Sequence, residues 1–225
     1  MFARRLALSY GLLALVSAAL LLAPGCSIGP KGHPPRGKIV FVNSDFYDKS
    51  GKFKVDAAKE AYLDFLKYHD YPVSDNLEKN LFVTDFGLGR FSEVGMGGVM
   101  WVNDEKFGYS AMELFLLPNQ MVPEHMHVKA GAVPARAQTV HVRKGKTFIY
   151  TEGEPAEKIW VTPPSIELNF ITVRLQNKME VGDTLELPPM KKHWMQSAPE
   201  GVIATEYQTF AAPDSTKFTD PKAVR

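Results

Sequence analysis

The chain has 225 residues, of which 45% are hydrophobic and 23% are charged, and its net charge is +1. This composition is that of a globular protein, and it gives no reason to expect nucleic acid or another strongly charged partner. A chain of this length can bury a sizeable core without disulfides, and its single cysteine excludes a disulfide framework.

The first segment, residues 1–25, has the pattern of a signal peptide. Arg4 and Arg5 precede the almost wholly apolar run Leu6–Leu22, and small residues follow up to Cys26. A lone cysteine at this point is typical of a bacterial lipoprotein, so we expect Cys26 to be lipidated and the protein to be exported and membrane-anchored through this lipid alone. Because Ser27 is not the aspartate that retains lipoproteins at the inner membrane, the outer membrane is favoured. A plain signal peptide and an uncleaved anchor are the alternatives.

Residues 26–38 are rich in Gly, Pro and Lys, and we interpret them as a tether. Residues 39–225 then form a single domain. A short strand is expected at Ile39–Val42, and an amphipathic helix at Val55–His69 provides a helical extension whose apolar face packs on a sheet. Pro72 ends that helix region.

From Leu81 onward the pattern becomes β. Short runs, often alternating and separated by Gly, Pro, Asn and Asp, predict many strands without an intervening helix, which indicates an all-β sandwich or barrel. The expected strands are Gly98–Val102, Ala111–Leu117, Thr139–Arg143, Thr147–Tyr150, Ile171–Leu175, Thr184–Leu187 and Val202–Phe210.

Three histidines form the candidate metal site. His125 and His127 are two residues apart on an expected strand, so their side chains share one face, while Glu124 points the other way. A second element, Gly182–His193, turns into and out of a strand and presents His193. A His-x-His pair alone is weak evidence, but the two elements together predict three neutral imidazoles suited to a divalent first-row metal.

A fourth metal ligand is less obvious. Residues 130–137 contain no carboxylate, and the next polar candidate is Gln138 at the start of a strand. If Gln138 faces inward, Val140 and Val142 do so too, and His141 is a surface histidine.

Two further polar residues could lie near this site. Glu206 shares a strand face with Ala204 and Gln208. These small or polar neighbours fit a solvated face and a polar cavity equally well. Lys129 shares the face of the histidine pair, with a solvated lysine at a strand end as the alternative.

Several stretches together resemble a known family, the cupin sugar isomerases of the D-lyxose isomerase type. The resemblance covers nearly the whole chain after the tether and is most specific at the two histidine elements, residues 123–138 and 182–193, which match the two cupin motifs. The other matching stretches are residues 46–53, 57–62, 68–74, 85–89, 101–103, 118–127 and 218–221. The resemblance implies a cupin β-barrel with a helical extension.

The family implies interconversion of an aldose and a ketose, helped by one divalent metal, manganese in the first place with iron, zinc or nickel as alternatives. A sugar or polyol is then the partner, and a homodimer is left open. Relatives carry a lysine and a metal-binding glutamate where this chain has Arg136 and Gln138. With these two replacements, Glu206 is left as the candidate proton carrier, and Lys129 is the candidate substitute for the family's lysine. The replacements also keep two other hypotheses open: a non-catalytic cupin lipoprotein that binds metal and sugar, and a cupin dioxygenase.

Overall fold

The computed structural model describes residues 39–224, which all belong to one compact unit. The predicted signal peptide, the lipidation site at Cys26 and the tether lie outside the described residues. Within the described part, no helix has the length and apolar character needed to cross a membrane.

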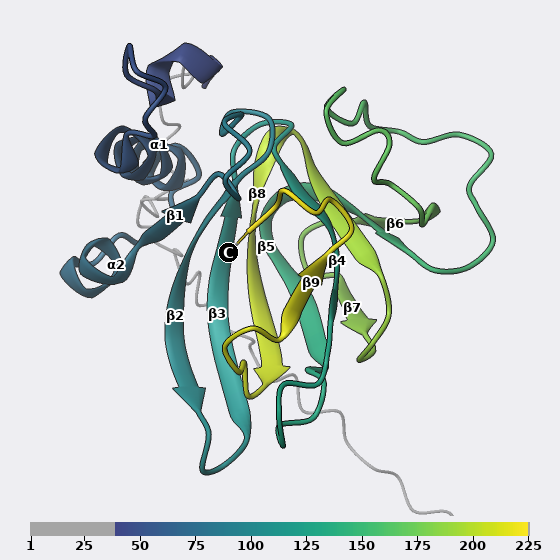
Figure 1. Cartoon of the computed structure of the whole chain (residues 1–225). Coiled ribbons are helices and arrows are strands. Elements are labelled where there is room, and N and C mark those ends of the chain that lie inside the picture. Colours follow the sequence, from purple (N-terminus) through teal and green to yellow (C-terminus); the bar gives the residue numbers. More distant parts are fainter. Residues whose placement is uncertain (1–38, 225) are drawn as a thin grey trace, which may run out of the picture. The chain divides into compact units, whose positions relative to one another are not determined.

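The fold is dominated by antiparallel strands that curl around an apolar core, as predicted (Figure 1). The strand order is β1-β2-β3-β8-β4-β9, and β5 pairs with β6, β7 and β8. The strands are β1 (Phe82–Thr84), β2 (Met96–Asp104), β3 (Tyr109–Leu116), β4 (Met121–His127), β5 (Gln138–Thr151), β6 (Leu175–Met179), β7 (Thr184–Leu187), β8 (His193–Thr209) and β9 (Thr216–Phe218).

Residue alternation separates the two faces of the sheet. On β3 and β8, Met112, Leu114, Val202 and Ala204 point into the barrel and are buried there with apolar residues from β4, β5 and β7. Their neighbours in sequence point outward, because successive side chains of a strand lie on opposite faces. Glu206 follows the inward series of β8.

The outer face of β2, β3 and β8 is covered by the N-terminal elements η1 (Asn43–Phe46), α1 (Val55–Tyr68) and α2 (Asp75–Asn80). Tyr62 and Phe65 of α1 are fully buried in a cluster that includes Phe115 and Ile203 of the sheet. Figure 1 shows both α-helices beside β1 and β2. The predicted helical extension on the outside of the barrel is therefore confirmed.

The longest strands, β5 and β8, form a bent ribbon. Their register shifts around Gly145, which pairs with Val202, and such bulges bend strands. Gly145 and Gly201 have φ of 71° and 73°, and a Cβ on Gly145 would lie 2.1 Å from the carbonyl oxygen of Gly201. Glycine is thus required at this bend. On the outer face, a Cβ on Gly201 would meet the ring of Phe65 at 2.4 Å.

Two local predictions were wrong. Ile39–Val42 forms no strand. The strands expected at residues 139–143 and 147–150 are confirmed, but they are joined in the single strand β5. The strand expected at Ile171–Leu175 is a loop, and β6 begins only at Leu175. The physical reason is that the N–H groups of Thr172 and Val173 donate to the Glu124 carboxylate, at 2.6 and 3.0 Å, rather than to a neighbouring strand.

Candidate metal centre

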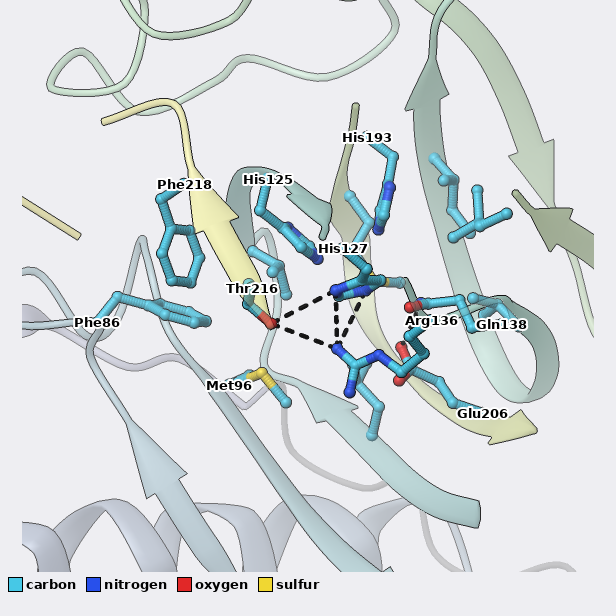
Figure 2. Close-up of a pocket in the computed structure, with 16 residues that line it drawn as sticks. Phe86, Met96, His125, His127, Arg136, Gln138, His193, Glu206, Thr216 and Phe218 are labelled. Carbon is cyan, nitrogen blue, oxygen red and sulfur yellow. Dashed lines mark hydrogen bonds between the residues drawn. The ribbon is translucent and has the colours of Figure 1, made fainter. Parts of the chain in front are cut away.

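The three predicted histidines meet in the barrel. His125 and His127 lie on β4, and β-pairing places His193, the first residue of β8, directly opposite His125. All three are buried, and one nitrogen from each can be chosen so that the set lies within 4.8 Å of one another (Figure 2). Among the described residues, this is the one such cluster of His, Cys, Asp and Glu.

Backbone carbonyls orient two of the rings. The Nδ1 of His125 lies 2.8 Å from the carbonyl oxygen of Pro123, and the Nδ1 of His193 lies 3.0 Å from that of Lys191. A carbonyl only accepts, so each Nδ1 carries the proton and each Nε2 keeps its lone pair. The buried Nε2 of His193 has no hydrogen-bond partner within residues 39–224. Such an atom fits a metal ligand.

The surroundings keep two of the three imidazoles neutral. Burial, with a smaller contribution from the nearby Arg136 guanidinium, lowers the pKa of His193 to about 4. Burial, together with the two neighbouring histidines, also holds the pKa of His125 well below its usual range. Neutral imidazole is the form that binds a metal, so the donor set fits a divalent cation at neutral pH.

Gln138 and Glu206 lie in the same cavity as the histidines. Gln138 begins β5 and is buried, and its Oε1 has no hydrogen-bond partner in the described part of the chain. Its Nε2 donates to Glu206 at 3.4 Å, and Gln208 donates to the other Glu206 oxygen at 2.8 Å. The sequence left open whether Glu206 lies on a solvated face or in a polar cavity. The structure places it in the cavity.

Arg136 also enters this site. Its guanidinium is buried, and its Nη2 lies 2.9 Å from Nδ1 and 3.1 Å from Nε2 of His127 (Figure 2). Thr216 Oγ1 lies 3.4 Å from both that nitrogen and His127 Nδ1. Sequence reasoning noted Arg136 as a replacement but did not place it against a histidine.

The C-terminal strand β9 completes the wall of the site. Thr216 pairs with His127 and Phe218 with His125, so both side chains line the cavity. Sequence reasoning missed both, because a three-residue strand carries no periodicity signal. We call this space, lined by the three histidines, Arg136, Gln138, Glu206, Thr216, Phe218 and apolar side chains, the inner cavity. Its volume is ≈ 20 Å³, room for about one water molecule.

Two other sequence candidates lie elsewhere. Lys129 follows the end of β4, is exposed, and is absent from the lining of the inner cavity. His141 lies on the opposite face from the buried Val140 and Val142, near Tyr207, as expected for a histidine outside the site.

Comparison with known proteins finds curated relatives that span most of the chain. A D-lyxose ketol-isomerase of Cohnella laeviribosi is 38% identical over 143 residues, which are 64% of this chain and 78% of the relative. A D-lyxose/D-mannose isomerase of Thermosediminibacter oceani is 32% identical over 174 residues, 77% of this chain and 95% of the relative. No family model matches.

Solved structures share the fold at much lower identity. The L-ribose isomerase of Cellulomonas parahominis with L-ribose superposes with a TM-score of 0.61 at 12% identity, covering 83% of this chain and 96% of that one. The L-ribose isomerase of Acinetobacter sp. DL28 in complex with L-ribose gives 0.60 at 11% identity, covering 80% and 95%. The predicted cupin barrel with an N-terminal helical extension is confirmed.

Proposed function

We propose, since this chain belongs to the D-lyxose isomerase family of cupin sugar isomerases, that it interconverts a free aldose and the corresponding ketose. D-Lyxose and D-mannose are the first substrates to test, because the two relatives carry these names. The observation that carries the proposal is that a buried histidine triad and a buried carboxylate line one cavity.

The metal ligands in this proposal are His125, His127 and His193, with the Oε1 of Gln138 as the fourth. The first three present ring nitrogens within 4.8 Å of one another, and the fourth is a buried carbonyl-type oxygen that has no hydrogen-bond partner within the described range. Manganese is our first choice, and iron, zinc and nickel suit such a set too. When bound, a divalent cation would polarise the sugar oxygens and stabilise the negative charge that develops next to the carbonyl.

Glu206 is the proposed proton carrier. Isomerisation removes a proton from C2 of the aldose and returns one to C1, while the hydroxyl proton passes from O2 to O1. Among residues 39–224, Glu206 is the one carboxylate that lines the inner cavity, so it can hold the carbon-bound proton between these steps. Donation from Gln138 and Gln208 to its two oxygens fixes its position. Lys129 has no part in the proposal, since it is exposed and remote from the lining.

A second candidate function is binding of metal and sugar without turnover. Two residues of the inner cavity favour it. Gln138 brings no negative charge, and Arg136 stays protonated at any useful pH and is a poor proton carrier.

The two functions differ in turnover. Purified protein loaded with Mn(II) is incubated with pentoses and hexoses, and ketose formation is followed by NMR. Turnover that falls at least about 100-fold in Glu206→Gln, with unchanged metal content, supports the isomerase. Glu186→Gln, which alters an exposed carboxylate on β7, is the matched control. Saturable sugar binding without turnover supports the binder, and His125→Ala/His127→Ala should lose the metal in either case.

Export and anchoring belong to the same proposal. Residues 1–25 have the pattern of a signal peptide and Cys26 the position of a lipidated first residue. Two or more acyl chains on one cysteine give stable membrane attachment. The site would then work outside the cytoplasm, at the outer membrane where the cell has one.

A further inference from the structure

The position of Arg136 disfavours a metal ion at the histidine triad. A neutral imidazole has one protonated nitrogen and one nitrogen with a free lone pair. The Arg136 Nη2 lies within 3.1 Å of both nitrogens of His127, and an atom that near to both can only lie over the face of the ring. The lone pair lies in the ring plane. The guanidinium is therefore held against the ring that would bind the metal.

The positive charge of Arg136 repels a divalent cation at the triad. Arginine remains protonated, and a divalent cation held by the triad would stand beside a second positive charge in a site that excludes bulk water. Coulomb repulsion is strong in such surroundings. Arg136 is 4% exposed in its present position, so it needs a defined place to move to.

The structure offers that place. A larger hollow of ≈ 570 Å³ lies on the other side of Arg136, lined by residues 211–218 with Met100, Asn103 and Asp220. We call it the outer hollow. Arg136, Thr216 and Phe218 line both spaces and so form the partition between them. Asp214 and Asp220 bring carboxylates to the outer hollow, which suits a guanidinium.

We propose that Arg136 is a positioning residue with two stations. In one it lies against the His127 ring and fills the inner cavity, and in the other it moves into the outer hollow, takes its positive charge away from the triad and opens the partition. Metal binding therefore disfavours the inward position. This inference rests on the metal site of the proposed function, and it predicts that Arg136 weakens metal binding.

Metal affinity tests the inference without any need for turnover. The Mn(II) dissociation constant is measured for the full chain by competition with a chelator. Arg136→Gln should bind about tenfold more tightly, because it removes a positive charge next to the bound cation. Lys217→Gln removes a positive charge that lines the outer hollow but not the inner cavity, and it should change the affinity less than about twofold. Circular dichroism checks that each variant is folded.

Arg136→Met, which keeps a long apolar stem, is the second variant should Arg136→Gln not fold. If the wild type binds Mn(II) and a folded Arg136 variant binds no more tightly, the two-station inference is refuted while the metal site stands. If neither the wild type nor the variant binds Mn(II), the proposed metal site fails and the inference falls with it. An equal gain in Mn(II) affinity in Lys217→Gln would also refute it, because the gain would then come from the lower net charge of the protein and not from the position of Arg136.

Discussion

Glu167 should make folding stability depend on pH in a direction opposite to that of most carboxylates. It lies in the loop between β5 and β6, is fully buried, and neither of its oxygens has a hydrogen-bond partner in the described structure. Burial, then the nearby charges of Asp220 and Glu124, raises the pKa of Glu167 to about 7. The folded protein therefore holds a proton that the unfolded chain has lost.

The sign follows from which state binds more protons. Below pH 4.5, the ordinary pKa of the group, both states are protonated and stability is full. As the pH rises to about 7 the unfolded chain ionises while the folded protein does not, so the free energy of unfolding falls. The pKa difference corresponds to about 3 kcal/mol, and to about 2 kcal/mol after allowance for solvent screening near this loop.

Urea unfolding at pH 4.5 and pH 8, with a chelator present, measures the effect. Glu167→Gln cannot ionise, so its stability should fall about 2 kcal/mol less than that of the wild type between the two pH values. Glu157→Gln, an exposed carboxylate in the same loop, should follow the wild type. Parallel pH dependence for Glu167→Gln and the wild type would refute the reasoning.

Three further changes test the site, its support and the anchor. Gln138→Glu adds a negative charge beside the triad and should tighten Mn(II) binding at least about tenfold in the chelator competition; unchanged affinity would mean that Gln138 does not contact the metal. Glu124→Ala removes the acceptor of four hydrogen bonds and the carboxylate that lies 3.3 Å from Lys192. The free energy of unfolding in urea should therefore fall by about 3–5 kcal/mol. A fall below about 1 kcal/mol would mean that Glu124 does not hold the loop at Thr172 and Val173 in place. Cys26→Ser should move the protein from the membrane to the soluble exported fraction on cell fractionation, and retention at the membrane would contradict the lipid anchor.

The parts of the fold that depend on local periodicity were predictable. The alternation along β4 places His125 and His127 on one face, and the 3.6-residue spacing predicts α1. Ile171–Leu175 has strand-like composition, but the Glu124 carboxylate takes its N–H groups, and only the tertiary structure shows this.

The candidate site was predictable to a similar extent. The histidine triad follows from two sequence elements, whereas the inward position of Glu206 depends on cross-strand neighbours that its sequence context does not specify. Arg136 comes from an irregular loop, and Thr216 from a strand whose pairing with β4 is long-range. Contacts of this kind depend on how distant segments meet, so no local pattern predicts them.

The bent ribbon of β5 and β8 has a consequence for how such a site can change. From His193 to Glu206 a straight strand would run roughly 40 Å, yet both residues line the inner cavity. The fold at Gly145 and Gly201, pressed from outside by Phe65, brings the two ends of the ribbon together. The distance between the proposed metal ligand His193 and the proposed proton carrier Glu206 is therefore set by the curvature of the backbone rather than by loops. Individual cavity residues can be exchanged while this spacing persists, so the barrel can lose or regain a reaction without rebuilding its frame.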